Sequence, residues 1–325
     1  MTLLYDNRWI NHQDSPGIAF SVDVGIKNES SLRVVKRIDG IWKMYELDTM
    51  AYHNYELLST ECYKKDEPTF LCLFAEVNLK ISDYVKTFHF DEDRKIVNKD
   101  ECVMSGFLIL PHPTHYRNSP IIVISHGGPL YMFNHEYSRL YHMLHLNKFC
   151  LYLLNYRGST GYTNSTLQSI NGNNGRQDVD DVHLTLLEVC QFEKLSTETV
   201  YCGGGSYGGF LSTHLVSQYP DFYKGCFLRN PLTNFLGEFY KKSPLYYADQ
   251  IKCPVTLFLG SEDKRVPMEQ GLQIYQNMMS RNQDVTVFIY NDGHALQSVE
   301  ASTSMMCEIL KFISRISPPK ALNLY

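Results

Sequence analysis

Residues 200–210, Val-Tyr-Cys-Gly-Gly-Gly-Ser-Tyr-Gly-Gly-Phe (VYCGGGSYGGF), decide the fold of this 325-residue chain. A short apolar run enters a glycine-rich turn at Ser206, and a helix is expected to begin at Tyr207. A serine on such a turn has strained backbone angles, and its neighbours approach so closely that glycines, here Gly204 and Gly208, are needed where a Cβ would clash. The stretch therefore predicts a nucleophile elbow with an exposed Ser206 hydroxyl.

A glycine-rich loop with an incidental serine would show the same local pattern, so the rest of the chain must decide. A serine hydroxyl is a poor nucleophile unless a base takes its proton and a third group orients that base. Asp263 follows the apolar run 253–260, and His294 follows the apolar run 285–290. Alone, the first is typical of a turn residue and the second of a surface histidine. Together they leave the carboxyl ends of two buried strands, in the α/β-hydrolase order Ser206, Asp263, His294, which predicts a catalytic triad.

A serine hydrolase also needs hydrogen-bond donors for the oxygen that becomes negative in the tetrahedral intermediate. The backbone N–H of Tyr207, the residue after the candidate nucleophile, is expected to be one donor. The strand expected at 120–125 leads into His126-Gly127-Gly128-Pro129, and we expect the N–H of Gly128 to be the second. His126 precedes the candidate nucleophile in the chain, so we interpret it as a residue that orders the loop.

Five motifs carry a family resemblance: HGGP at 126–129, NYRGSTGY at 155–162, GGSYGG at 204–209, RNP at 229–231 and DKRVP at 263–267. In order and context they resemble the prolyl oligopeptidase family of serine peptidases. The RNP motif and the His-Ala-Leu at 294–296 are most similar to its acylaminoacyl peptidase branch, also called acyl-peptide hydrolases. The resemblance extends from about residue 102 to residue 315.

The resemblance implies an α/β-hydrolase domain, with a mostly parallel sheet covered by helices on both faces, behind a seven-bladed propeller. It implies a serine peptidase that releases an N-acylated, often acetylated, amino acid from short peptides without a metal or organic cofactor. Dipeptidyl peptidase relatives hold a free amino terminus with paired glutamates, and the chain has no Glu-Glu pair. That favours a blocked or absent amine, and Arg229 is a candidate contact for the acyl or peptide carbonyl.

Strand and helix patterns alternate after residue 102, which is typical of a mostly parallel sheet between helical layers. We therefore expect an α/β-hydrolase catalytic domain over 101–325. Strands are expected at 104–110, 121–125, 149–155, 200–203, 223–228, 255–260 and 285–290, and helices at 133–147, 178–193, 207–218, 268–280 and 299–316. The segment between the RNP motif and the strand before Asp263 is shorter than in the family, and insertions at this place lie on loops beside the active site.

The first hundred residues read as strands at 32–38, 40–47, 55–59 and 70–77, separated by polar turns. They resemble the last blades of the family's propeller, so we expect a partial propeller over 1–100. A blade takes roughly 40–50 residues, so at most about two blades fit. We interpret the chain as a truncated isoform, a fragment or an incomplete gene model. Unclosed blades leave strand edges unpaired, so we expect the protein to be oligomeric, for instance a homo-oligomer, or poorly soluble. A chain starting near Asp100 is expected to be more soluble and to associate less.

Charge and composition limit the kinds of molecule that the chain is expected to bind and the compartment in which it is expected. A formal net charge of −5 without a basic cluster offers no attraction for nucleic acid or acidic membranes. Residues 1–6 lack the pattern of a secretory signal, and no apolar run reaches the length of a membrane span. Nine widely spaced cysteines favour buried free thiols over disulfides or zinc. We therefore expect a cytoplasmic protein.

Three functions remain open. The first is an active serine hydrolase that prefers short N-acylated peptides. The second is a catalytically silent truncated chain that pairs with a full-length subunit. The third is an esterase for small substrates, because a pocket without a complete propeller would admit esters readily.

Overall fold

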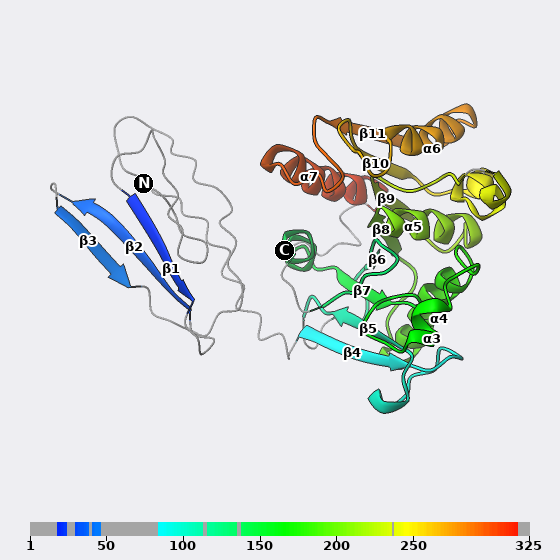
Figure 1. The fold of residues 1–325 in the computed structure, drawn as a ribbon, viewed down its shortest axis with the longest axis horizontal. Helices are drawn as coiled ribbons and strands as arrows, with labels where there is room; N and C mark the ends of the chain where they lie inside the picture. Colours follow the sequence, from blue (N-terminus) through cyan, green and yellow to red (C-terminus); the bar gives the residue numbers. More distant parts are fainter. Residues whose placement is uncertain are drawn as a thin grey trace. The chain divides into compact units, whose positions relative to one another are not determined.

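The computed structural model divides the chain into two compact units, Met1–Leu79 and Lys80–Tyr325 (Figure 1). It describes residues 18–24, 30–38, 41–46, 84–112, 116–134, 138–235 and 237–317.

The first unit contains an antiparallel sheet of three described strands in the order β1-β2-β3. Their bounds are β1 (Ile18–Val24), β2 (Ser30–Ile38) and β3 (Ile41–Glu46). The strands β2 and β3 correspond to those expected at 32–38 and 40–47, whereas β1 was not expected. The strands expected at 55–59 and 70–77 lie outside the described residues, and the assignment of this unit to a propeller stays a prediction.

The second unit is built on an eight-stranded sheet in the order β11-β10-β9-β8-β6-β7-β5-β4. The strands are β4 (Val85–Phe90), β5 (Met104–Ile109), β6 (Ile121–Ser125), β7 (Cys150–Asn155), β8 (Val200–Gly205), β9 (Gly225–Arg229), β10 (Val255–Gly260) and β11 (Val285–Tyr290). From β7 to β11 the neighbours are parallel. The pairs β4–β5 and β5–β7 are antiparallel. The central strands are apolar and fully buried, as strands covered on both faces must be.

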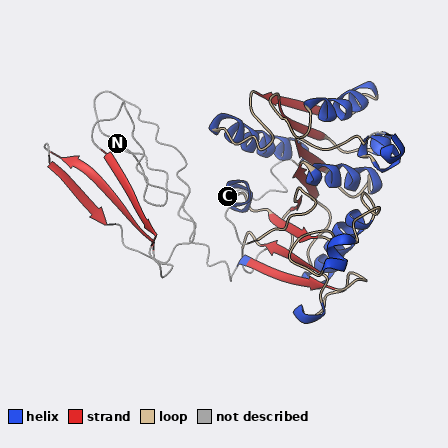
Figure 2. Cartoon of the chain, viewed as in Figure 1, coloured by secondary structure: helices blue, strands red, loops and turns tan. Residues whose placement is uncertain are grey.

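Helices cover both faces of this sheet, which confirms the expected α/β-hydrolase architecture (Figures 1 and 2). The helices are α2 (Arg139–Leu146), α3 (Asn164–Gln168), α4 (Gln177–Glu193), α5 (Tyr207–Gln218), α6 (Met268–Ser280) and α7 (Val299–Ile316), with 3-10 turns at Lys99–Glu101, Gly237–Lys242 and Pro244–Gln250. One core cluster takes its helical residues from α4, α5 and α6. The other takes them from α2 and α7. In the described part of the chain, no helix has the length and hydropathy needed to cross a bilayer.

Two boundaries differ from those expected. The helix predicted over 133–147 begins only at Arg139, after the cap residue Ser138. Phe133 instead bonds through its N–H and its carbonyl to the side chain of Asn155, at 2.6 and 3.1 Å. The sheet also begins before residue 100, because Val85 pairs with Ile109 and adds β4 to its edge.

Candidate active site

Ser206 stands at the junction of β8 and α5 with φ 58° and ψ −121°. Such a backbone costs about 1–3 kcal/mol for a residue other than glycine, so its surroundings must hold it. Its N–H donates to the carbonyl of Arg229 at 2.9 Å, and its own carbonyl accepts from Leu232 at 3.1 Å. A Cβ on Gly204 or Gly208 would lie 2.7 or 2.1 Å from the carbonyl oxygen of Ser125. The turn therefore has the local geometry of a nucleophile elbow.

Asp263 lies in the loop after β10 and His294 in the loop after β11, and their side chains are in contact. The distance from His294 Nδ1 to Asp263 Oδ2 is 2.6 Å, and the carboxylate side chain is wholly shielded from solvent. Because a carboxylate only accepts, this bond places the proton on Nδ1 and leaves Nε2 free as a base. Burial would raise the pKa of Asp263, but the hydrogen bond from His294 and the N–H groups of Val266 and Arg265 lower it. The carboxyl is thus held in its charged form.

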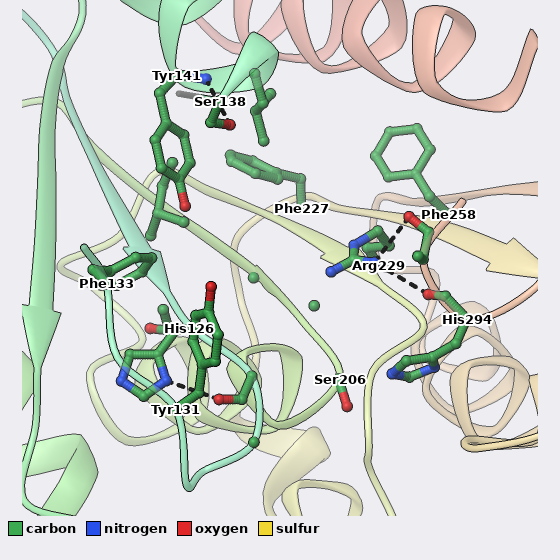
Figure 3. A pocket seen from close by; sticks show the side chains of 18 of the residues that line it. His126, Tyr131, Phe133, Ser138, Tyr141, Ser206, Phe227, Arg229, Phe258 and His294 are labelled. Atoms are coloured by element: carbon green, nitrogen blue, oxygen red, sulfur yellow. Dashed lines mark hydrogen bonds between the residues drawn. The ribbon is translucent and has the colours of Figure 1, made fainter. Parts of the chain in front are cut away.

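Ser206 and His294 border one cavity of about 580 Å³ (Figure 3). Among the residues drawn there, no hydrogen bond joins Ser206 Oγ to the imidazole. Such contacts commonly tighten only when substrate binds. The polar lining includes Gly127, Gly128, Arg229 and Arg265. The apolar wall comes from strand ends and from α2 and α7, with Ile124, Phe227, Phe258, Leu140, Tyr141, Met305 and Ile309. The cavity can therefore bind an apolar group beside the candidate nucleophile.

The two candidate oxyanion donors come from different segments of the chain. Gly128 borders the cavity in the loop after β6, with φ 118°. Tyr207 opens α5 directly after Ser206. His126 is buried, with Nδ1 2.8 Å from the carbonyl of Gly127 and Nε2 2.9 Å from Ser159 Oγ. Burial lowers the pKa of His126 to about 4. This histidine is therefore neutral, and its contacts with Gly127 and Ser159 fit the loop-ordering role expected from the sequence.

The side chain of Tyr207 is hydrogen-bonded to a buried carboxyl, that of Asp178, which no sequence pattern indicated. The Tyr207 hydroxyl donates to Asp178 Oδ2 at 2.7 Å and accepts from Asn174 Nδ2 at 2.8 Å. Asp178 Oδ1 also accepts from the N–H of Gly175 at 2.8 Å. Burial raises the pKa of Asp178 to about 6, although these hydrogen bonds oppose the rise. The Asp178 carboxyl is therefore charged at neutral pH and is bound to the side chain of Tyr207, the first residue of α5.

Two arginines of the family motifs, Arg229 and Arg157, have partners within the protein. Arg229 borders the cavity, and its Nη1 donates to the carbonyls of His294 and Ala295 at 3.1 and 2.9 Å (Figure 3). Arg157, in the NYRGSTGY motif, is bound to the buried carboxylate of Asp181. Arg94 reaches the same carboxylate at 2.9 Å. Within the described ranges, no group of three or more His, Cys, Asp or Glu side chains is placed to hold a metal ion.

Most of the second unit matches a known protein family. Residues 136–248 and 236–318 match the family described as Prolyl oligopeptidase family. The acylamino-acid-releasing enzyme of Rattus norvegicus is 35% identical over 260 residues, which cover 70% of this chain and 36% of the relative. That of Homo sapiens is 37% identical over 224 residues, covering 59% and 31%. The chain thus spans about a third of the length of these curated relatives.

Solved structures show the same fold. An acylaminoacyl peptidase of Pyrococcus horikoshii superposes with a TM-score of 0.65 at 18% identity, covering 96% of this chain and 58% of that chain. An acylaminoacyl peptidase in complex with Z-Gly-Gly-Phe-chloromethyl ketone gives 0.66 at 19% identity, covering 95% and 58%.

Proposed function

Because this chain belongs to the prolyl oligopeptidase family, we propose that it is a serine peptidase that releases an N-acylated amino acid from short peptides. The observation that carries the proposal is one cavity bordered by Ser206, on its strained turn, and by His294, whose Nδ1 is bound to the shielded carboxylate of Asp263. In this proposal Ser206 is the nucleophile, His294 the base and Asp263 the group that orients the base.

The chemistry follows from this arrangement. Ser206 Oγ attacks the carbonyl carbon while His294 Nε2 takes the hydroxyl proton, and Asp263 stabilises the imidazolium. The N–H groups of Tyr207 and Gly128 donate to the oxygen that becomes negative. His294 then returns the proton to the leaving amine as the C–N bond breaks. Water then attacks the carbonyl carbon of the acyl-enzyme while His294 takes its proton. The bond to Ser206 Oγ breaks, the proton returns to Ser206, and the product leaves as a carboxylate.

Substrate preference is inferred from the relatives and from the cavity wall. The curated relatives are acylamino-acid-releasing enzymes. No carboxylate forms an ion pair with Arg229 among the described residues, and burial lowers the pKa of this guanidinium. With Nη1 engaged by loop carbonyls, we propose that its remaining N–H groups donate to the acyl or peptide carbonyl, the kind of partner a buried donor requires. The apolar wall would hold the side chain of the released residue.

A labelling experiment tests the function. Wild-type protein should react with a fluorophosphonate probe, and Ser206→Ala should not, because the probe reports only an activated serine. Acetyl-alanine p-nitroanilide should be cleaved faster than alanine p-nitroanilide, whose amine is free. Hydrolysis of p-nitrophenyl acetate without cleavage of either anilide would replace the peptidase by an esterase. A wild-type chain that neither reacts with the probe nor hydrolyses any substrate would be the silent form.

A further inference from the structure

The end of β9 contacts all three segments that carry the candidate triad. This strand lies between β8, which precedes Ser206, and β10, which precedes Asp263. The loop of His294 crosses the end of β10 so closely that a Cβ on Gly260 would lie 2.5 Å from the carbonyl oxygen of Asp292. Arg229, the last residue of β9, therefore lies beside Ser206, and Asn230, the next residue, lies beside the loop of His294.

The side-chain amide of Asn230 is bound both to the loop of His294 and to the end of β10. Its Nδ2 donates to the carbonyl of His294 at 2.8 Å, and its Oδ1 accepts from the N–H of Gly260 at 2.8 Å. Its own N–H donates to the carbonyl of Phe258 at 2.9 Å. Only 2% of Asn230 is exposed, its φ is 42°, and it does not border the cavity. Asparagine is one of the few residues other than glycine that favour such a backbone.

Arg229 contacts both Ser206 and the loop of His294. Its carbonyl accepts the N–H of Ser206 at 2.9 Å. Its Nη1 donates to the carbonyls of His294 and Ala295. The imidazole of His294 is thus held through Nδ1 by Asp263, while its backbone is held by Arg229 and Asn230.

We propose that Asn230 is a positioning residue that, together with Arg229, sets the place of His294 relative to Ser206. The effect on turnover rests on the proposed function, whereas the effect on the position of His294 does not. Proton transfer from Ser206 Oγ to Nε2 depends on their separation, and a misplacement of about 1 Å can cost about 10²-fold in rate. Because Asn230 is outside the cavity wall, its loss acts on the rate of the chemical step and leaves substrate binding intact.

The test variant is Asn230→Asp. Aspartate fits the same backbone and still accepts from Gly260. It donates nothing to His294, however, and places a carboxylate against the carbonyl oxygens of His294 and Gly293, which lie 2.8 and 3.4 Å from Asn230 Nδ2. We expect kcat to fall by roughly 10²-fold with KM changed by less than about twofold. Asn147→Asp is the matched control, because Asn147 Nδ2 donates to the carbonyl of Met143 at 2.8 Å, away from the cavity.

The fluorophosphonate reaction separates positioning from damage to the fold. In Asn230→Asp the labelling rate should fall by roughly the same factor as kcat, while the final labelled fraction equals that of wild type. A lower final fraction that labels at the wild-type rate would show a structural role only and overturn the proposal. A wild-type rate and fraction in Asn230→Asp would overturn it as well.

A measurement without turnover keeps the inference independent of the proposed function. With ¹⁵N-labelled histidine, the proton between His294 Nδ1 and Asp263 is observable by NMR and is assigned by its loss in His294→Gln. We expect its signal to shift or vanish in Asn230→Asp and to persist in Asn147→Asp. If the wild-type protein is inactive, the proposed function fails and this signal still decides the role of Asn230. An unchanged signal in Asn230→Asp would refute the positioning role.

Discussion

Replacing Asp178 by asparagine should change how the stability of the second unit depends on pH. Burial raises the pKa of Asp178 from 3.8 to about 6. Between about pH 4 and pH 6 the folded state therefore binds more protons than the unfolded state, so the free energy of unfolding falls as the pH rises through this window. A pKa difference of about 2 between the two states corresponds to about 3 kcal/mol in total. About 2 kcal/mol of this is lost between pH 4 and pH 7, because the carboxyl of the unfolded chain is already partly ionised at pH 4.

The asparagine side chain does not ionise, so the Asp178→Asn variant should not lose this free energy. The unfolding free energy of Asp178→Asn minus that of wild type should increase by about 2 kcal/mol from pH 4 to pH 7, whatever its value at pH 4. Urea denaturation followed by circular dichroism at 222 nm measures it, because the described helices belong to the second unit. Tryptophan fluorescence would not, since Trp9 and Trp42 both lie in the first unit.

Asp221→Asn controls for the loss of a carboxylate, since the Asp221 side chain is 83% exposed. A difference between Asp178→Asn and wild type that stays constant within about 1 kcal/mol from pH 4 to pH 7 would refute the reasoning. It would mean that the three hydrogen bonds to Asp178, from Tyr207 and the N–H groups of Gly175 and Val179, offset its burial in full.

Three further predictions concern the elbow, the triad and the sheet edge. Asp263→Asn should lower kcat by roughly 10⁴-fold with an unchanged unfolding midpoint, because the imidazole loses its orienting partner; normal turnover would remove Asp263 from the triad. Gly208→Ala should destabilise the fold by at least about 1–3 kcal/mol, since its Cβ would lie 2.1 Å from a backbone oxygen; a wild-type urea midpoint would contradict this. A chain starting at residue 80 should be better behaved by light scattering than one starting near Asp100, which lacks β4 and its buried Phe88 and Phe90; equal behaviour would show that β4 is dispensable.

Much of the site was predictable because its signals are local. The close approach of the elbow to Ser125 requires glycines at 204 and 208, and this requirement is visible in the sequence. The apolar runs before Asp263 and His294 become neighbouring parallel strands, whose carboxyl ends lie at one edge. The carboxyl ends of neighbouring parallel strands lie at the same edge of a sheet, independent of the loops that connect the strands. The order of strands and residues in the chain was therefore enough to predict that these two side chains lie near each other.

Local patterns in the chain were sufficient to predict the α/β alternation and the elbow, because periodicity and glycine placement show them within a few residues. The order of the candidate triad followed from the strands that these patterns locate. The partners of Asp178, Arg229 and Asn230, the bonds from Asn155 to Phe133 ahead of α2, and the addition of β4 to the sheet became visible only in the folded chain. These contacts join residues that are distant in the chain. A buried polar group must find a partner, but which partner depends on the loops that meet around it, and no local pattern encodes that meeting.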